Sequence, residues 1–592
     1  MTPHPEAFAA IGAATAPAFS RDGQTLFHLR GSGLPQVWAL DLATGASRQL
    51  TFHDEKVALL RRSPLDDRLI YGIDRGGDER QQLLLIDPQG ASPEPRELTL
   101  NAAVIHDFGA WSPDAARIAY AANERDEAHF DVYVQDVASG VRECAFRGSN
   151  QVSVSGFRSD GARLALLHDR GFGDVSLLVL DPASGEARAL GSPSNFRSVR
   201  WASDGRTLLA LTDHGDTNFL RLCGLDPDSG DVSVVYEAAG RDVEAWSIAS
   251  DACSLATIEN DRGYAVLRVG SIDGERPVVT GLPRGIVTDL TWSADSTTLA
   301  FSVAAPTEPP SLWLWRDGAA RVAWRPEPPP GLGDFVDLEL VSWQSFDGTH
   351  VAGWFALPRG PQPADGYPAV MWVHGGPVGQ TRPNFRPDIQ MLLAQGFAIL
   401  MPNVRGSSGY GRTYTKSDDV ERRLDSVTDL AHGRHWLAAH PAIDGERIAI
   451  MGQSYGGFMV MSAITEHPEL WRAAVNYYGI ADFASLLAGT GAWRRSHRAA
   501  EYGDPERDAE LFARISPIHR VDRIRAPVLI AHGTRDPRVP IGESEQFVAA
   551  LQERQKKVAY ETFDYAGHGF IRPDDKGRIY TAVADFFTTH LR

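Results

Sequence analysis

The sequence is short of cysteine, of positive charge and of long apolar runs, and each shortage excludes a class of protein. Its three cysteines, Cys144, Cys223 and Cys253, fall in separate repeats of the N-terminal half, so we expect buried apolar thiols in a reducing compartment. Asp and Glu outnumber Lys and Arg by 76 to 58, and the formal charge of -18 does not suit nucleic acid, whose phosphates need a basic surface. No apolar stretch reaches the roughly 20 residues that span a membrane.

Targeting and cofactor signals are also missing. No Lys or Arg precedes Arg21, and the alanine-rich N-terminus contains Glu6 and Pro17, so it makes a poor signal peptide. Cysteine and histidine form no cluster at metal-ligand spacing, and no glycine-rich loop is suited to hold a phosphate. We therefore expect a cytoplasmic protein that needs no cofactor or metal and binds neither nucleic acid nor a membrane. Homo-oligomerisation stays open.

The first half of the chain contains a repeat. An aromatic residue followed after two positions by Asp or Asp-Gly precedes an apolar strand, and seven copies recur at about 45 residues, the blade period of a β-propeller. We interpret the Asp-Gly pairs as hairpin turns and not as ligands. The sequence thus predicts an all-β, seven-bladed propeller over residues 1–328. The copies, one of them looser, are Phe19–Gly23, Arg62–Asp66, Trp111–Asp114, Phe157–Gly161, Trp201–Gly205, Ile248–Asp251 and Trp292–Asp295.

A proline-rich stretch, Arg325–Gly333, follows the last repeat. Such a stretch cannot join the interior of a sheet, so it marks a boundary between domains. We expect a second domain over residues 335–592.

The second domain carries a nucleophile motif. Gly452–Gly456 reads Gly-Gln-Ser-Tyr-Gly and lies between an apolar strand at 447–451 and a helical pattern that begins at Phe458. A strand-turn-helix elbow of this kind holds the serine hydroxyl clear of the backbone, and the two glycines leave room for the turn. Ser454 is therefore the candidate nucleophile of an α/β-hydrolase domain.

A serine nucleophile needs a base and a carboxylate, which follow it in this fold in the order Asp or Glu, then His. The apolar strand at 526–532 delivers Asp536 just past its end, and the strand at 558–563 is followed by a glycine loop with His568. We predict a catalytic triad of Ser454, Asp536 and His568.

Four nearby residues compete for these roles. His532 lies inside a strand and is interpreted as structural, whereas His519 and His590 lie at element ends without a glycine loop. Asp564 precedes His568 too closely to face it and is interpreted as a turn residue.

Several motifs together resemble the prolyl oligopeptidase family of serine peptidases. In chain order they are Trp372–Pro377, Asn403–Gly411, the Ser454 elbow, His532–Asp536 and Gly567–Gly569. Within the family, Ser516–Ile524 and Asp536–Arg538 are most similar to the acylaminoacyl peptidase branch. The resemblance independently implies a two-domain protein in which a seven-bladed β-propeller caps an α/β-hydrolase domain.

Catalysis also requires hydrogen-bond donors where the oxyanion develops. The amide of Tyr455 is one donor on geometric grounds, since it directly follows the nucleophile. For the second donor the resemblance implies the hydroxyl of Tyr410, which we predict. A backbone N–H of Gly375 or Gly376 is the alternative.

The pocket for the substrate side chain is expected under the segment 478–516. Phe483 and Trp493 are candidate lining residues, and core positions in a packed helix are the equal alternative. The arginines of the same segment, at 494, 495 and 498, are interpreted as a solvated face, although they would favour acidic side chains if they turned inward.

Arg538 lies two residues beyond Asp536 and matches an arginine of the acylaminoacyl branch. A guanidinium there can engage carbonyl or carboxylate oxygens of a bound peptide through paired hydrogen bonds. A salt bridge within the loop is the alternative.

These features predict a serine peptidase that hydrolyses short peptides through an acyl-enzyme, an oligo- or exopeptidase similar to acylaminoacyl peptidases, whose propeller excludes large substrates. A carboxylesterase with the same triad is the alternative. Dipeptidyl aminopeptidases of the family grip a free amino terminus with paired glutamates, but this chain has no Glu-Glu, and Glu124–Glu127 is the nearest acidic cluster. A propeller interaction module with an inert hydrolase half conflicts with the complete triad.

Overall fold

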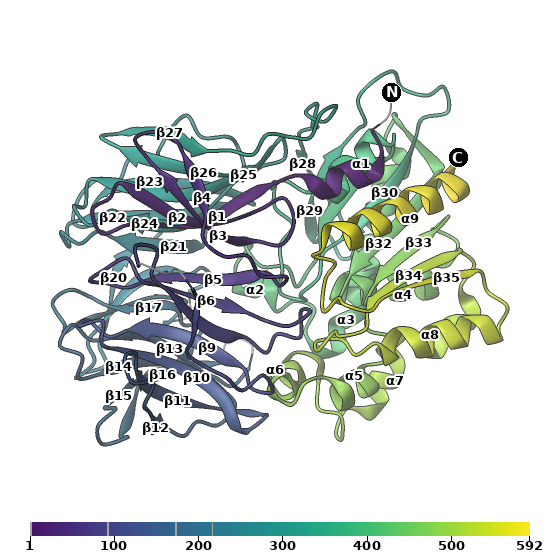
Figure 1. Ribbon diagram of the computed structural model, residues 1–592. Coiled ribbons are helices and arrows are strands. Elements are labelled where there is room, and N and C mark those ends of the chain that lie inside the picture. Colours follow the sequence, from purple (N-terminus) through teal and green to yellow (C-terminus); the bar gives the residue numbers. More distant parts are fainter. Residues whose placement is uncertain (1–2, 91–93, 172–173, 216) are drawn as a thin grey trace.

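Two domains lie side by side in the computed structural model, a ring of β-sheets and a layered α/β domain (Figure 1). The structure describes residues 3–90, 94–171, 174–215 and 217–592. The last strand of the ring ends at Trp324 and the first strand of the second domain begins at Glu339, so the proline-rich stretch Arg325–Gly333 runs between them.

Within the described residues the ring contains seven antiparallel sheets that follow one another along the chain, six with four strands and one with three. The predicted seven-bladed propeller is confirmed. Blade 1 contains β1 (Ala13–Phe19), β2 (Thr25–Gly31), β3 (Gln36–Asp41) and β4 (Ser47–Gln49). Blade 2 contains β5 (Val57–Arg62), β6 (Leu69–Ile73), β7 (Gln82–Ile86) and β8 (Arg96–Glu97). Blade 3 contains β9 (His106–Trp111), β10 (Arg117–Asp126), β11 (His129–Asp136) and β12 (Arg142–Phe146). Blade 4 contains β13 (Gln151–Phe157), β14 (Leu164–Asp169), β15 (Val175–Leu180) and β16 (Ala187–Ser194). Blade 5 contains β17 (Arg197–Trp201), β18 (Leu208–Thr212), β19 (Arg221–Leu225) and β20 (Val232–Tyr236). Blade 6 contains β21 (Val243–Ile248), β22 (Ser254–Asp261) and β23 (Tyr264–Ser271). Blade 7 contains β24 (Ile286–Trp292), β25 (Thr298–Ala305), β26 (Glu308–Arg316) and β27 (Ala319–Trp324).

The repeated aspartates act as turn residues. Asp22 Oδ1 accepts hydrogen bonds from the Ser20 hydroxyl at 2.6 Å and from the Gln24 N–H at 3.0 Å, which ties the turn between β1 and β2. Asp114 and Asp295 bind their own turns in the same way. The side chain replaces backbone partners that a tight turn cannot supply.

The second domain is built on an eight-stranded sheet with the order β28-β29-β31-β30-β32-β33-β34-β35. From β31 onward along this order the strands are parallel, so their carboxyl ends share one edge. The strands are β28 (Glu339–Gln344), β29 (His350–Ala356), β30 (Tyr367–Val373), β31 (Ala398–Asn403), β32 (Ile443–Gln453), β33 (Ala474–Tyr477), β34 (Val528–Gly533) and β35 (Val558–Phe563).

Helices cover both faces of this sheet and enclose two hydrophobic clusters, the arrangement of an α/β-hydrolase domain. One face carries α3 (Arg423–Ala439), α4 (Tyr455–Glu466), α8 (Gly542–Glu553) and η3 (Pro517–Arg523); the other carries α1 (Pro387–Ala394) and α9 (Pro573–Leu591). The remaining elements are α2 (Arg412–Thr415), η2 (Val420–Arg422), α5 (Phe483–Gly489), α6 (Ala492–Tyr502) and α7 (Ala509–Ile515).

The N-terminal segment crosses from the propeller to this domain. The turn η1 (Pro5–Ala10) packs beside α9, as Figure 1 shows, and Phe8 is buried in the cluster that contains Phe397 and Phe587. Residues 1–328 therefore do not all lie in the ring, whose first strand begins at Ala13. Phe8 packs against the apolar face of α9 and not on the propeller, because burial at that face removes the Phe8 ring from water.

The cysteines differ from the expectation of buried thiols. Cys223 is buried, and burial raises the pKa of its thiol, but Cys144 and Cys253 are exposed. Cys144 lies on β12, the last strand of blade 3, where side chains alternate between core and solvent, and Cys253 lies in the turn between β21 and β22. Among the described helices none is long and apolar enough to cross a membrane.

Candidate active site

The sharp turn at Ser454 depends on the two glycines of its motif. Ser454 has φ 57° and ψ -123° between the end of β32 and the start of α4. A Cβ on Gly452 would lie 2.5 Å from the Gly456 carbonyl oxygen, and a Cβ on Gly456 would lie 2.3 Å from the carbonyl oxygen of Val373. Only glycine lets these backbones approach so closely.

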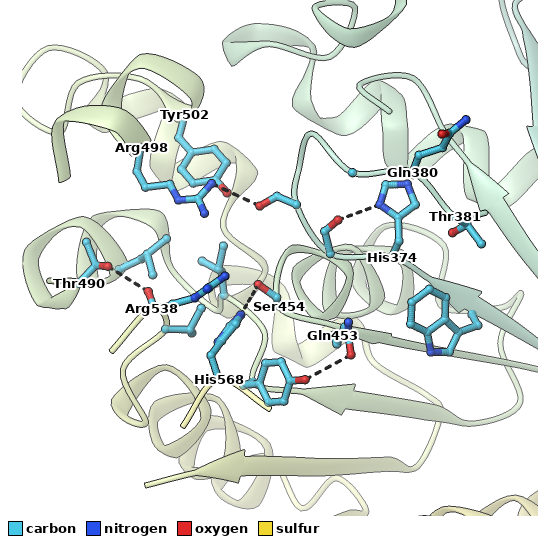
Figure 2. Close-up of a pocket in the computed structure, with 18 of the residues that line it drawn as sticks. His374, Gln380, Thr381, Gln453, Ser454, Thr490, Arg498, Tyr502, Arg538 and His568 are labelled. Carbon is cyan, nitrogen blue, oxygen red and sulfur yellow. Dashed lines mark hydrogen bonds between the residues drawn. The ribbon is translucent and has the colours of Figure 1, made fainter. Parts of the chain in front are cut away.

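The structure brings the three predicted triad residues together at the carboxyl edge of the sheet. Figure 2 shows two of them, with the His568 ring directed at Ser454. His568 Nε2 lies 2.8 Å from Ser454 Oγ, and His568 Nδ1 lies 2.6 Å from Asp536 Oδ2. Asp536 Oδ1 also accepts the backbone N–H groups of Arg538 at 2.8 Å and Val539 at 3.0 Å. An ionised Asp536 only accepts hydrogen bonds, so Nδ1 carries the imidazole proton and Nε2 accepts the Ser454 hydroxyl.

Electrostatic effects keep His568 neutral and Asp536 ionised at neutral pH. Burial lowers the pKa of His568 below its usual 6.5, and the hydrogen bond to Asp536 only partly offsets that shift. Burial alone would raise the pKa of Asp536, but its bonds to His532 and His568 outweigh burial and hold the carboxyl far below its usual range. The ring of Tyr478 lies 4.7 Å from that of His568 and shields it from water. A neutral histidine beside an ionised aspartate can act as a general base.

The competing residues do not contact Ser454. His532 is fully buried and its ring nitrogens lie 2.7 Å from Ser544 Oγ and 2.9 Å from the Val539 carbonyl oxygen, so it braces the loop that carries Asp536. Asp564 is exposed in the turn after β35.

Tyr410 is not brought to the nucleophile. Its hydroxyl accepts a hydrogen bond from Asn403 Nδ2 at 2.9 Å. Tyr410 is among the residues that line a different cavity, together with Tyr264, and it is not among those that line the cavity at Ser454. The loop with Tyr410 leaves β31, whereas β30 is the strand that lies directly beside β32. This geometry does not support the oxyanion role predicted for Tyr410.

The loop after β30 adjoins the nucleophile instead. A Cβ built on Gly375 would lie 3.2 Å from the Cβ of Ser454 and 3.8 Å from its Oγ. Val373 pairs with Gly452 in the parallel ladder, which fixes this proximity. Gly375 and Gly376, whose N–H groups are the alternative donors, therefore lie beside Ser454 in the lining of the same cavity.

A cavity of about 440 Å³ surrounds Ser454. Ile480, Leu486 and Val539 give it apolar walls. Of the candidate lining residues, Phe483 is fully buried against Phe458, Tyr502 and Phe512, in core rather than in the pocket. A short helix has the same sequence pattern whether its apolar face packs in the core or lines a substrate pocket. The sequence alone therefore could not distinguish these two roles for Phe483.

Trp493 belongs to the domain interface. It packs in a cluster with Phe130, Val152 and Val154 of the propeller and lines a second cavity of about 330 Å³, which adjoins the first at Arg498.

Two of the three arginines on α6 turn inward, so the expected solvated face is wrong for them. Arg494 Nη1 lies 3.5 Å from Glu79 Oε2, and Arg498 Nη1 donates to the Gly376 carbonyl at 3.3 Å. Arg495 is exposed. The propeller covers this side of α6, which the helix sequence alone does not reveal.

Arg538 lines the cavity and also joins the domains. Its Nε donates to Glu79, in the propeller loop between β6 and β7. The same loop reaches the triad, because Gly567 beside His568 packs on the backbone of Gly77 so closely that a Cβ would lie 2.0 Å from the Gly77 oxygen. The ion pair therefore spans two domains rather than one loop.

Sequence reasoning missed a buried network beneath the elbow. Arg423 Nη1 donates to Asp418 at 2.7 Å and to the Tyr455 hydroxyl at 3.0 Å, and its Nη2 donates to Glu501 at 2.7 Å. Burial raises the pKa of Asp418 to about 7, although Arg423 opposes the shift. Asp418, Asp419 and Glu501 lie close enough to ligate a metal ion, but the guanidinium of Arg423 already supplies the positive charge between two of them. No sequence motif marks these residues.

Comparison with known proteins agrees with this site. Residues 383–592 match the model of the prolyl oligopeptidase family. The C-terminal domain belongs to this family of serine peptidases. The predicted resemblance is thereby confirmed, and the chain is a serine-type peptidase related to acylaminoacyl peptidases and dipeptidyl aminopeptidases.

Among prolyl oligopeptidase relatives, dipeptidyl aminopeptidase BIII of Pseudoxanthomonas mexicana is 27% identical over 543 residues, which cover 88% of this chain and 78% of the relative. The acylamino-acid-releasing enzyme of Rattus norvegicus is 26% identical over 318 residues, 50% of this chain and 43% of that enzyme. The crystal structure of puromycin hydrolase superposes with a TM-score of 0.88 at 19% identity, over 100% of this chain and 96% of the other. The structure of Pyrococcus horikoshii acylaminoacyl peptidase superposes with a TM-score of 0.76 at 20% sequence identity, over 99% of this chain and 97% of the other. Both structural likenesses establish the shared fold.

Proposed function

We propose that this peptidase hydrolyses short peptides through an acyl-enzyme on Ser454, as acylaminoacyl peptidases do. The observation that carries the proposal is the position of His568, which is hydrogen-bonded to Ser454 at 2.8 Å and to Asp536 at 2.6 Å and lines the cavity together with Ser454. Ser454 attacks the scissile carbonyl while His568 takes its proton and then passes it to the leaving amine. Water activated by His568 releases the acyl group.

Two backbone donors complete the proposed mechanism. The Tyr455 amide lies at the N-terminus of α4, where helix N–H groups lack intrahelical acceptors. The Gly375–Gly376 loop supplies the second donor. Oriented N–H groups stabilise the negative charge that forms on the carbonyl oxygen.

The propeller supports a preference for blocked amino termini. A free ammonium needs an unpaired carboxylate, but the propeller glutamates that reach the cavity arginines are engaged: Glu79 with Arg538 and Arg494, and Glu244 with Arg382 at 2.6 Å. Dipeptidyl aminopeptidase activity is the second candidate, favoured by the similarity to dipeptidyl aminopeptidase BIII over 88% of this chain.

The propeller also supports selection by size. Its loops pack on the His568 loop and on α6, so long or folded chains would meet the ring before they reach Ser454. We also propose a cytoplasmic location, because all three cysteines are free thiols, as a reducing compartment permits.

Turnover of three substrates tests the proposal. Purified enzyme and a Ser454→Ala variant would be assayed with an acetyl-alanyl anilide, a free dipeptidyl anilide and a nitrophenyl ester. We expect the acylated anilide to give the highest kcat/KM and the variant to lose nearly all turnover while folding normally. Preference for the free dipeptide would establish the second candidate, and turnover of the ester alone would establish a carboxylesterase.

A further inference from the structure

Among the described residues that line the active-site cavity, one arginine has no carboxylate partner. Four arginines line this cavity, and three of them form ion pairs. The pairs are Arg382 with Glu244, Arg386 with Asp388, and Arg538 with Glu79. Within the described residues, Arg498 instead meets the Gly376 carbonyl at 3.3 Å and the face of the Tyr502 ring at 6.0 Å, with no carboxylate at ion-pair distance.

The surroundings of Arg498 carry surplus positive charge. Glu79 is shared between Arg538 and Arg494, so one carboxylate serves two guanidinium groups. Burial, together with the charges of Arg498 and Arg538, lowers the pKa of Arg494 to about 10. Because a confined, partly dehydrated cation gains more from an anion than a cation in water does, a substrate carboxylate would bind here favourably.

The position of Arg498 identifies the part of the substrate that it meets. It contacts Gly376, in the loop proposed to hold the oxyanion, while His568 approaches Ser454 from another side (Figure 2). The leaving group departs toward His568, which protonates it. On this argument the guanidinium is assigned to the acyl side of the scissile bond, in a cavity whose lining also includes Leu486 and Val539.

We propose that Arg498 binds the carboxylate of an Asp or Glu side chain on the residue whose carbonyl Ser454 attacks. The inference rests on the proposed function and names its substrate class. The planar guanidinium can take both carboxylate oxygens, while the side-chain methylenes contact the apolar walls. Arg498 is thus a specificity residue, and the general base and nucleophile work without it.

The test compares two substrates of nearly equal shape, acetyl-glutamyl and acetyl-glutaminyl p-nitroanilide, with acetyl-alanyl p-nitroanilide as reference. We expect the wild type to favour Glu over Gln in kcat/KM by about 10- to 100-fold, the usual effect of hydrogen bonds to a charged group. Arg498→Gln should bring that ratio close to one, and Arg498→Lys should leave an intermediate ratio. Arg495→Gln is the matched control, because it removes the same charge from the exposed side of the same helix and should keep the wild-type ratio.

Two results would overturn the inference while leaving the proposed function intact. One is Ser454-dependent cleavage of the alanyl substrate without a preference for Glu over Gln. The other is an unchanged ratio in Arg498→Gln. Failure of all three anilides would instead refute the proposed function and the inference with it.

A second source of carboxylate, the C-terminus of a short peptide, needs its own comparison. Acetyl-Ala-Ala and its C-terminal amide differ only in that group. If Arg498→Gln slows the free acid far more than the amide, Arg498 binds the leaving peptide and the acyl-side assignment is wrong. We expect both to change equally.

Discussion

Gly456→Ala should disable the nucleophile without unfolding the protein. The added Cβ would lie 2.3 Å from the Val373 carbonyl oxygen and 2.6 Å from that of His374, whereas ordinary contact begins at 3.4 Å. The start of α4 must therefore move from the end of β30 by about 1 Å. Both obstacles are backbone atoms of a buried sheet, so no side-chain rotation relieves them.

This displacement acts on catalysis more than on stability. Alanine gains up to about 1 kcal/mol over glycine in a helix, and less in the first turn, where Gly456 lies, so this gain offsets only a small part of an overpacking cost of about 1–3 kcal/mol. A misplacement near 1 Å of a reacting group, however, costs on the order of 100-fold in rate. We expect kcat/KM for the acetyl-alanyl anilide to fall about 100-fold, with a small change in Tm.

The matched control is Gly542→Ala, at the start of α8, where an added Cβ meets no atom within 4 Å. It should keep wild-type kcat/KM. Near-wild-type activity in a folded Gly456→Ala variant would show that the elbow tolerates movement, which would refute the argument from close approach.

Three further predictions follow from the same site. Tyr410→Phe should change kcat by less than about 3-fold, because the hydroxyl is bonded to Asn403 outside the cavity; a loss of about 10²- to 10³-fold in steady-state kcat would restore it as an oxyanion donor. The pH profile of kcat/KM should rise through an apparent pKa below 6.5 and then stay level, since attack needs neutral His568 and burial lowers the pKa of that imidazole; a midpoint above 6.5 would contradict this. Arg423→Met should lower the free energy of unfolding by about 3–5 kcal/mol in denaturant titrations, because it leaves the carboxylates of Asp418 and Glu501 buried without their counter-charge, and an unchanged midpoint would show that they protonate at little cost.

The sequence by itself determined the features that depend on local geometry. Each Asp turn of the propeller binds its own backbone within a few residues, so the repeat alone yields the seven blades. The Ser454 elbow is likewise local, because its two glycines are required by contacts of that turn with itself and with the neighbouring strand. Asp536 and His568 could be predicted because parallel strands end at one edge of the sheet, wherever the helices lie.

Only the tertiary structure decided which side chains face the substrate. Tyr410 and Gly375 follow neighbouring strands, and the sheet order β31-β30-β32 brings Gly375 to Ser454 and keeps Tyr410 away. Arg498 points inward because the propeller covers one side of α6, while Arg495 on the same helix remains in water. A long, flexible cation has no intrinsic preference between these environments, so its direction is set by packing between domains that are distant in the chain.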